Sequence, residues 1–282
     1  MLKTGMSFRR ILVGFQFTAS VAVVITALLM YRQMQFVKEK DLGFNTRDVV
    51  LINVQDTLTM NRMPEISEAL ENSPYVVSSA MAAHVSGHNT FRSILSLEAD
   101  EGDFQKKVVD FIEVGTSYFR TMEIDIIEGQ SFETVSMDSG VYPVMVNEAM
   151  VNMMGWENPI GKELLGDFDQ DGNPIYKAKI VGVTQDFNSH SLHQPIKPMV
   201  IYYSDRPKGV LHVRVDSGHL LAALDDIEKV WSKMAARTPF QFTFLNKDLM
   251  ELYRSETLQS RLILYLTYLA IFISFLGLTG LA

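Results

Sequence analysis

His190 and His193, with Asp186 close by in the sequence, have residue types and spacing that could bind a metal ion. Imidazole nitrogens and carboxylate oxygens are zinc ligands, and two histidines three residues apart share one face when the segment is helical. Pro195 and Pro198 come shortly after, however, and favour a loop over a helix. We therefore predict no metal site from this pair.

His84 and His88 form a second pair with helical spacing, but Gly87 and Asn89 lie beside them and favour a turn. No set of serine, histidine and aspartate and no Gly-x-Ser-x-Gly motif can be assembled to activate a nucleophile. Acidic residues are plentiful, but no two stand out as an acid–base couple. The sequence therefore predicts a chain that is not an enzyme, with no catalytic, cofactor-binding or metal-binding residues.

The segment DFDQDG at residues 167–172 matches the start of a calcium-binding loop. Calcium takes several oxygen ligands, and an EF-hand loop supplies two of them from a glutamate at its twelfth position. Ala178 stands at that position here, which excludes an EF-hand. We interpret Asp171 and Gly172 as the tip of a solvent-exposed hairpin.

The segment GWENPIGKE at residues 155–163 superficially resembles a phosphate-binding loop. Five residues, rather than the four of that motif, separate Gly155 from Gly161. Glu163 stands where a serine or threonine would hold magnesium, and the preceding residues 147–154 predict a helix rather than a strand. We therefore predict no nucleotide binding here.

The composition narrows the classes of protein further. The 282 residues are 47% hydrophobic and 21% charged, which is too apolar for a disordered chain. The absence of cysteine excludes a disulfide scaffold and a cysteine-based zinc module. The formal net charge of −8 argues against nucleic acid as a partner, because surfaces that bind nucleic acid are basic.

Two long uncharged segments lie near the ends of the chain, at residues 11–30 and 262–282. A helix of about 20 residues spans the ~30 Å hydrocarbon core of a bilayer. A buried helix of a soluble protein would keep a polar stripe, and a cleaved signal peptide would have a shorter apolar region that ends in a small-residue cleavage site. We therefore predict two transmembrane helices, of which the first is a retained anchor.

The charges beside the first span predict its orientation. Lys3, Arg9 and Arg10 precede it with no acidic residue among them, so the positive-inside rule places the N-terminus in the cytoplasm. The other 22 basic residues stand against 33 acidic ones, a net charge of −11. The segment between the spans is then extracytoplasmic. The second span stops at Ala282 with no basic residue after it, from which we expect a fragment of a longer membrane protein.

Small residues recur along both spans and would let helices approach closely in lipid. In the first span they occupy every fourth position, at Gly14, Thr18, Ala22 and Thr26. In the second span they are Ala270, Ser274, Gly277 and Gly280. We predict that both spans pack against other helices, in a further part of the protein or in a partner.

The segment of about 230 residues between the spans is predicted to be a mixed α/β (α+β) domain. Helical patterns continue from both spans as stalks, at residues 31–45 and 246–261, and the first stalk is expected to end at Gly43. Apolar runs predict strands at residues 49–54, 76–83, 94–99, 107–114, 209–215 and 240–244. Further helices are predicted at residues 64–72, 116–122, 147–154 and 220–236.

Two strand–helix–strand units, one early and one late, are predicted to share one sheet of split βαβ type. Residues 46–116 and 207–245 then form its two halves, and residues 117–206 form an inserted subdomain. The cytoplasmic end, residues 1–10, together with the two spans and the two stalks, completes the division of the chain.

Several short runs, taken in order, resemble the MacB/FtsX-like permeases of ABC transporters, the mechanotransmission type. They are RILVGFQFTAS at residues 10–20, KDLGFN at 40–45, VNEA at 146–149, MGWENPIGK at 154–162, VGVTQDF at 181–187, SLH at 191–193, PIKP at 195–198, YRSE at 253–256 and LAIFISFLGLTGLA at 269–282. No single run carries the resemblance. Their order and spacing carry it together, over nearly the whole chain.

The resemblance implies a MacB-like periplasmic core between two transmembrane helices, with a porter-like split βαβ part and an inserted, sabre-like subdomain. It implies a permease subunit in which a separate cytoplasmic ABC ATPase drives conformational change outside the membrane, for export, efflux or lipoprotein handling. The other implied partners are a second permease copy or half, a periplasmic adaptor or substrate protein, and membrane lipid. The implied location is the bacterial inner (cell) membrane, as a multi-pass protein.

The alternative prediction is the extracytoplasmic sensor domain of a two-span membrane receptor, which has the same layout. The two predictions differ in the segment expected after residue 282, since a receptor continues into a signalling helix and a permease into another span. A membrane-anchored hydrolase is disfavoured because the sequence supplies no catalytic constellation. The transported substrate is not identified by the sequence.

Overall fold

The computed structural model describes residues 2–54, 56–88, 90–135, 142–168, 174–192, 194–205, 209–235 and 237–279. The chain separates into two compact units. The helical hairpin comprises Met1–Asp41 and Met250–Ala282, and the core domain comprises Leu42–Leu249.

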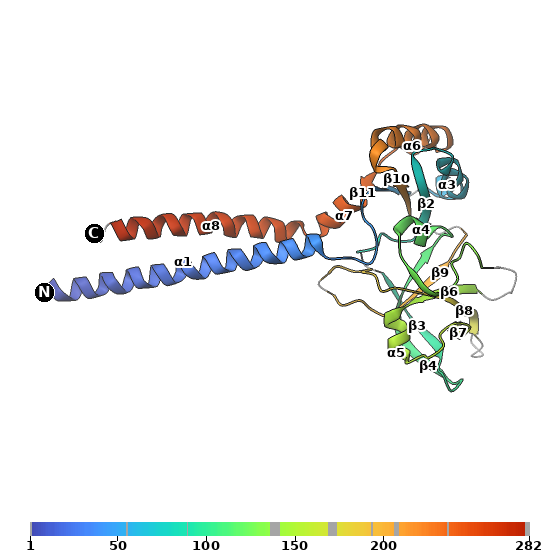
Figure 1. The fold of residues 1–282 in the computed structure, drawn as a ribbon, viewed down its shortest axis with the longest axis horizontal. Helices are drawn as coiled ribbons and strands as arrows, with labels where there is room; N and C mark the ends of the chain where they lie inside the picture. The colour runs from blue at the N-terminus through green and yellow to red at the C-terminus, as the bar shows by residue number, and fades with distance from the viewer. Residues whose placement is uncertain are drawn as a thin grey trace. The chain divides into compact units, whose positions relative to one another are not determined.

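The helical hairpin consists of α1 (Leu2–Glu39) and α8 (Arg254–Thr279), which run side by side in opposite directions (Figure 1). By length and composition, windows of both helices could cross a membrane, at Val13–Val37 and Arg254–Gly277. Only 6% and 11% of these windows are buried within the structure, which is unlike the core helix of a soluble protein. Residues 280–282 of the second predicted span lie outside the described residues.

Small residues of α8 contact α1, in accord with the close approach expected from their size. The hydroxyl oxygens of Ser20 and Ser274 lie 2.7 Å apart, and Ser20 also donates to the Ala270 carbonyl at 3.4 Å. A Cβ added at Gly277 would lie 3.1 Å from the Gln16 Oε1. The hairpin therefore pairs through small and polar side chains.

The predicted small-residue stripe of the first span faces away from this contact. Gly14, Thr18, Ala22 and Thr26 are all exposed in the described structure. The Thr18 and Thr26 hydroxyls donate to carbonyls of their own helix, four residues earlier. The stripe is thus left on the surface of the hairpin.

The core domain contains the predicted split βαβ sheet. Its first unit is β1 (Val49–Asn53), α3 (Met63–Glu71) and β2 (Val76–Ala82). Its second unit is β10 (Val210–Val215), α6 (Leu220–Met234) and β11 (Thr243–Phe244). The strand order is β11-β1-β10-β2 with antiparallel neighbours, so each unit inserts one strand between the strands of the other. The interleaved arrangement confirms the sequence prediction.

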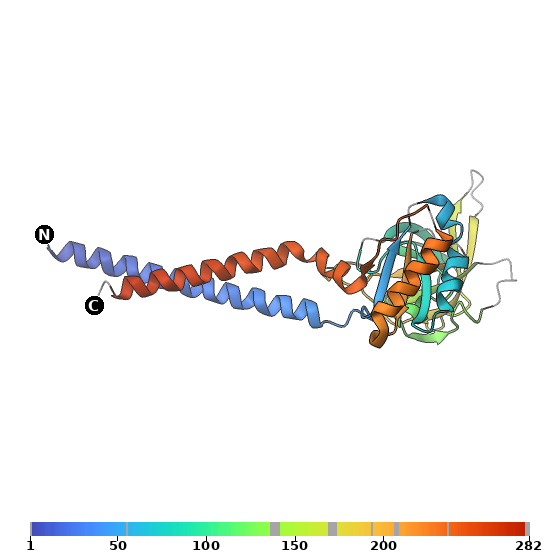
Figure 2. The same ribbon diagram turned by 90° about the horizontal axis from the view of Figure 1, so that it is seen from above.

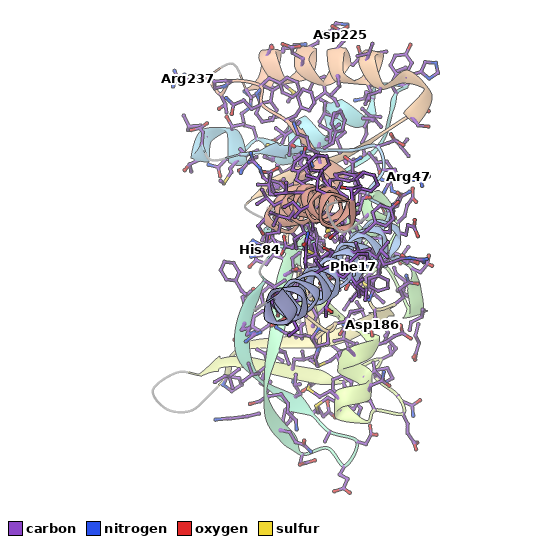
Figure 3. All side chains as sticks on the ribbon, turned by 90° about the vertical axis from the view of Figure 1, so that its left-hand side faces the viewer. Phe17, Arg47, His84, Asp186, Asp225 and Arg237 are labelled. Carbon is purple, nitrogen blue, oxygen red and sulfur yellow. The ribbon has the colours of Figure 1, made fainter. Side chains whose placement is uncertain are left out.

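The helices α3 and α6 lie side by side over one face of this sheet (Figure 2). Leu211, Val213 and Val215 of β10 point toward them and share a buried cluster with Ile227 and Trp231 of α6. The outer face of α6 is polar, and Asp225 projects from it (Figure 3). The alternation along β10 sends its even-numbered residues to the opposite face of the sheet.

The remaining strands form a closed barrel. Around the ring they are β4 (Phe104–Val114), β3 (Phe91–Glu98), β7 (Glu163–Phe168), β8 (Pro174–Thr184), β6 (Tyr142–Asn147) and β9 (Met199–Tyr203). The ring closes because β9 pairs in parallel with β4. The short strand β5 (Ile126–Gly129) pairs with β8, and β2 joins the barrel at the pair Ala82 and Val114.

The barrel has its own hydrophobic core. Leu97 of β3, Val109 of β4 and Leu164 of β7 are buried there with Val144 and Val200 of β6 and β9. The strands β3 and β4 precede residue 117, yet they pack with the later strands. The barrel therefore contains strands from both sides of residue 117, the predicted start of the inserted subdomain.

Four short helical segments connect these strands: α2 (Thr57–Met60), α4 (Tyr118–Met122), α5 (Glu148–Met154) and the 3-10 turn η1 (Ser217–His219). α7 (Leu245–Leu252) comes directly after β11 and leads out of the core domain. The predicted helices at 64–72, 116–122, 147–154 and 220–236 and the predicted strands before residue 216 are present, with ends that differ by a few residues.

Two local predictions were wrong in extent. The strand expected at residues 240–244 includes only Thr243 and Phe244, which are the residues that pair with β1. α1 ends at Glu39, so Gly43 does not terminate the helix. Gly43 has φ of +77° in the extended segment after α1, where it allows a close contact between two backbones.

Candidate functional site

The entry linker, residues 42–48, leads from α1 into β1 and is held by hydrogen bonds to distant segments. The Leu42 carbonyl accepts from the Asn188 backbone N–H at 2.8 Å and from its side-chain Nδ2 at 3.2 Å. The Asn45 N–H donates to the carbonyl of Met122 at 2.9 Å. Extended segments without such partners would be free to move, so these bonds fix the path of the linker.

Gly43 allows the linker to lie directly against the loop after β8. A Cβ at this position would lie 2.4 Å from the Asp186 carbonyl oxygen and 2.8 Å from the Phe187 Cα. Its positive φ also disfavours any other residue. The approach of two backbones at this point therefore requires glycine.

We expect Gly43→Ala to displace the entry linker and to destabilise the core domain by about 2 kcal/mol or more, because steric overlap and backbone strain add. Thermal unfolding of the detergent-solubilised chain would measure the loss. Gly14→Ala is a matched control, since a Cβ there meets no atom within 4 Å. Equal melting temperatures for the two variants would contradict the assigned contact.

Arg214 of β10 lies on the face of the sheet opposite to α3 and α6, and there it binds the entry linker. Its Nε donates to the Thr121 carbonyl at 2.7 Å, and its two terminal nitrogens donate to the carbonyls of Arg47 and Asn45 at 3.0 Å each. The guanidinium is 7% exposed and lies 3.3 Å from Glu123 Oε1. Burial lowers the pKa of Arg214, and the Glu123 charge opposes that effect.

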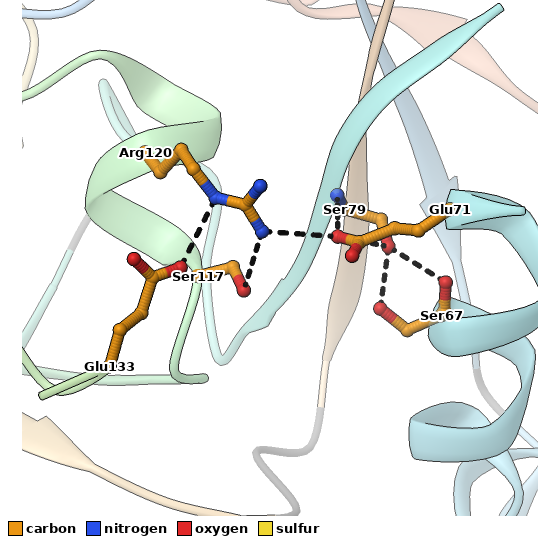
Figure 4. Close-up of polar contacts among 6 residues, drawn as sticks. All are labelled: Ser67, Glu71, Ser79, Ser117, Arg120 and Glu133. Carbon is orange, nitrogen blue, oxygen red and sulfur yellow. Dashed lines mark hydrogen bonds and ion pairs between the residues drawn. The ribbon is translucent and has the colours of Figure 1, made fainter. Parts of the chain in front are cut away.

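A polar network connects the helices on the two sides of β2 (Figure 4). Arg120 of α4 donates to Glu133 Oε1 at 3.1 Å, and its Nη2 lies 3.6 Å from Glu71 Oε1 of α3. Glu71 in turn accepts from the Ser79 N–H at 2.8 Å, and the Ser67 and Ser79 hydroxyls lie 2.6 Å apart. The network supplies the acceptor for the Ser79 N–H of β2.

The chain leaves the core domain at α7, whose first turn is held by the loop between β2 and β3. Asp248 Oδ2 of α7 lies 2.6 Å from Nε2 of His88 in that loop. The same loop donates from the Gly87 N–H to the Ser189 carbonyl at 3.2 Å. Ser189 is next to Asn188, which binds the entry linker. The entry linker and α7 are therefore connected by hydrogen bonds through two loops, at residues 84–88 and 186–190.

The loop at residues 186–190 is anchored to the barrel by the buried carboxylate of Asp110. His190 Nε2 contacts Asp110 Oδ2 of β4 and lies 3.0 Å from the Thr90 hydroxyl. Arg92 of β3 donates from Nε to the other Asp110 oxygen at 2.9 Å. The Asp110 side chain is 2% exposed and that of His190 is 7% exposed. A buried carboxylate with two such partners holds the loop firmly against β3 and β4.

We call this assembly the junction: the entry linker, the loops at residues 84–88 and 186–190, and the first turn of α7. It contains hydrogen bonds and ion pairs, with no nucleophile beside a base among its described residues. Displacement of the entry linker would act on the exit helix and on the barrel through the same bonds. The junction therefore connects the entry linker, the exit helix and the barrel mechanically.

The described residues that suggested metal sites have other partners. Asp186 accepts from the Ala149 N–H at 2.9 Å, and its own N–H donates to Glu148 Oε2 at 3.0 Å, which satisfies the start of α5. Burial raises the pKa of Asp186. His84 packs edge-on against a ring of β3, and burial lowers its pKa. His193 lies outside the described residues.

Within the described ranges, no group of three or more histidine, aspartate and glutamate side chains could hold a metal ion. The phosphate-loop-like segment forms turns instead. Gly155 ends α5 with φ of +70°, Gly161 has φ of +90°, and Lys162 pairs with Asp100 at 2.8 Å. Each of these groups already has a structural partner or role.

The calcium-like segment joins β7 to β8, which pair antiparallel as the predicted hairpin requires. Asp169, Asp171 and Gly172 lie outside the described residues. Ala178, at the twelfth position, is buried in β8 opposite Leu164.

Sequence reasoning missed Asp110, Asn188 and Arg214, which carry the junction. Arg214 alone left a local signal, because it interrupts the apolar strand VLHVRV, where a polar residue needs a buried partner. In the first turn of α7, the Asp248 side chain contacts His88, and the Lys247 N–H donates to Asn246 Oδ1 at 2.7 Å.

Neither a family model nor a curated protein sequence matches this chain. Among solved structures, the periplasmic region of MacB from Actinobacillus actinomycetemcomitans is similar at 12% identity and a TM-score of 0.50, over 77% of this chain and 97% of that one. A domain of a protein named as a permease, from Porphyromonas gingivalis, has 14% identity and a TM-score of 0.47, over 71% and 92%. The extracellular domain of the ABC-type transporter YknZ from Gram-positive bacteria has 11% identity and a TM-score of 0.43, over 69% and 97%.

At this identity, the likeness to the MacB region concerns the fold. It extends over nearly all of that region, and the interleaved sheet and the barrel both lie in the part of this chain that forms one compact unit. The core domain therefore has the MacB-like periplasmic fold, flanked in this chain by two apolar helices long enough to cross a membrane.

Proposed function

We propose that this chain is a permease subunit of an ABC transporter of the mechanotransmission type. It couples ATP hydrolysis by a separate cytoplasmic ATPase to a conformational change of the core domain outside the cytoplasm, and it catalyses no reaction itself. The observation that carries the proposal is the junction, in which the entry and exit segments of the core domain are hydrogen-bonded through two shared loops.

The connection of these segments to the sheet supports the proposal. The entry linker continues into β1, and α7 comes after β11, which is the neighbour of β1 in the sheet. Val50 lies opposite Phe244 and Leu51 opposite Thr243. A relative movement of α1 and α8 would therefore act on two adjacent strands, whose interleaved partners carry it into the rest of the sheet.

The two apolar helices and the basic N-terminus support a location in the bacterial inner membrane with the core domain outside. The exposed stripe of small residues on α1 supports packing against further helices, from a second permease copy or half. A cytoplasmic ABC ATPase is the proposed energy source. The cargo would be exported, or extracted from the membrane as a lipoprotein.

The absence of native cysteine allows a direct test of helix movement. We expect the double variant Ser20→Cys/Ser274→Cys to form a disulfide under oxidant, because the two native hydroxyl oxygens lie 2.7 Å apart. In the membrane protein assembled with a cognate ABC ATPase, the crosslink should abolish most of the ATPase activity gained on assembly. A reductant should restore that activity. Vesicle-reconstituted ATPase assays measure both effects.

The single cysteine variants, treated with the same oxidant, are the matched controls and should keep full activity. The proposal fails if the full-length protein forms no complex with the ATPase, or if assembly leaves the ATPase rate unchanged. Formation of the disulfide without loss of activity would show that α1 and α8 move as one body. A two-span receptor would bind no ATPase.

A further inference from the structure

The two ends of the barrel have different linings. Interior positions toward one end are aliphatic and closely packed, with Leu97, Leu164 and Ala178 among them. Toward the other end the same alternating interior positions become aromatic, as at Tyr176 of β8 and Tyr202 of β9, which lie against the aliphatic core. The barrel is thus filled at one end and lined by rings at the other.

The aromatic end holds a cavity of about 440 Å³. Its described lining comes from all six strands of the ring and the residue after β9: Ser93, Leu95, Phe111, Glu113, Tyr142, Gly166, Tyr176, Tyr202, Tyr203 and Ser204. A concavity of a few hundred Å³ that combines aromatic rings with a set of polar groups has the form of a small-molecule site.

Gly166 keeps this cavity open. It faces Tyr176 across the β7–β8 pair, and a Cβ at this position would lie 3.0 Å from Leu95 Cδ2 and 3.5 Å from Tyr176 Cδ1. Any larger side chain would project from the wall into the space between these residues. Its φ is not positive, so the backbone itself does not demand glycine here.

The rings of Phe111, Tyr176 and Tyr202 meet at steep angles. Phe111 meets Tyr202 edge-on at 5.8 Å and 86°, and Tyr176 meets Tyr202 at 5.4 Å and 66°. Tyr142 stacks on Tyr176 at 5.0 Å. Rings at steep angles offer more than one π face to a ligand held between them, which is the geometry that binds methylated ammonium groups.

The described lining of the cavity carries only negative charge. Glu113 is exposed at the cavity and is the one charged residue in its described lining. No ion pair to Glu113 is present within the described part of the chain. Burial raises the pKa of Tyr176, and the neighbouring Tyr202, Tyr142 and Glu113 raise it further, so that ring remains uncharged at neutral pH. An anion would find no positive partner among the described residues of this lining.

We propose that the aromatic end of the barrel is a binding site for a small organic cation with a methylated ammonium group, held in the cavity against Phe111, Tyr176 and Tyr202 and paired with Glu113. The ring faces supply cation–π attraction, and the carboxylate supplies the matching charge. The proposal does not rest on the proposed function, because the site belongs to the core domain by itself.

The test compares phenyltrimethylammonium with its neutral isostere tert-butylbenzene, by ligand-observed NMR on the chain in maltoside micelles. We expect the cation to bind with a Kd on the order of 0.1–1 mM, about tenfold more tightly than the isostere. Glu113→Gln should weaken the cation about fivefold and leave the isostere unchanged. Gly166→Leu should abolish the binding of both, because it fills the cavity.

Glu101→Gln is the matched control for Glu113→Gln, since it removes an exposed carboxylate from the β3–β4 turn, away from the lining. The same micelles surround every variant, so partition into detergent cancels between variants tested with one ligand, and the two ligands are compared by their free aqueous concentrations. Tyr202→Leu removes one ring and provides a second variant if Gly166→Leu melts early. Equal affinity for cation and isostere, or equal affinities for the two glutamine variants, would overturn the proposal. So would cation binding that survives both cavity variants.

Discussion

Replacement of Arg214 by methionine is expected to destabilise the core domain by about 3–5 kcal/mol, the usual cost of removing one partner from a buried charged network. The variant leaves the carbonyls of Thr121, Arg47 and Asn45 without their donor, and methionine fills much of the same volume without replacing it. The entry linker would then lose its hold on the sheet. The free energy of unfolding in urea gives the direct measurement.

The chain contains two tryptophans, Trp156 and Trp231, and both are buried in the core domain. Their fluorescence therefore reports on the unfolding of the core domain in the detergent-solubilised chain, with no contribution from the helical hairpin. Each tryptophan also donates to a backbone carbonyl, Trp156 to Glu98 and Trp231 to Thr238, so both environments are native-specific.

Arg62→Met is the matched control. The exposed Arg62 also donates to a backbone carbonyl, that of Met234 at 2.7 Å, but water replaces this bond readily, so its loss should cost less than about 1 kcal/mol. Arg214→Lys should lie between the two, because it keeps the charge and loses the three-way geometry. If Arg214→Met is no more destabilising than Arg62→Met, the assigned role of Arg214 is wrong.

His212 should make the stability of the core domain depend on pH. The ring is fully buried in β10 beside Tyr118, at a centroid distance of 5.8 Å, and its Nε2 has no partner in the described structure. Burial lowers the pKa of His212 to about 4 from its ordinary value of 6.5, although hydrogen bonds to Val210 and Ala80 and the charge of Asp248 oppose this. The native state therefore holds a neutral imidazole at neutral pH.

The sign of the effect comes from proton uptake. Between pH 6.5 and about 4 the unfolded chain binds a proton at His212 and the native chain does not, so the unfolding free energy falls as the pH is lowered through this window. The full loss is on the order of 3 kcal/mol. The His212→Gln variant should lack this part of the pH dependence when urea unfolding is followed at a series of pH values.

The exposed His219 provides the comparison, because His219→Gln removes a histidine whose side chain is 59% exposed. That variant should retain the steep fall of stability below pH 6.5. Parallel curves for His212→Gln and the parent chain would contradict the expected burial of a neutral imidazole.

Much of the architecture was accessible from local patterns. The uncharged runs predicted both long apolar helices, shorter apolar runs predicted β1, β2 and β10, and helical periodicity predicted the amphipathic α6. The order of strand and helix in the two units also predicted their shared sheet. These features depend on hydrophobic periodicity and segment length, which are written into neighbouring residues.

The closed barrel could not be predicted from hydrophobic periodicity and segment length. Its closure depends on the parallel pairing of β4 with β9, in which Asp110 lies opposite Met199. The pairing of strands so far apart in the chain depends on their register and on how their side chains pack in one common core. Local sequence patterns contain no information about such pairing. For the same reason the boundary expected at residue 117 does not separate the strands that share that core.

The sequence by itself determined which segments are apolar enough to leave water and which must be helix or strand. Tertiary structure alone decided that Leu42, Asn188, His88 and Asp248 meet at one junction. It also decided that the rings of Phe111, Tyr176 and Tyr202 surround one cavity. The physical reason is that burial preference belongs to each residue, whereas a polar partner or a cavity wall exists only once distant segments have packed together.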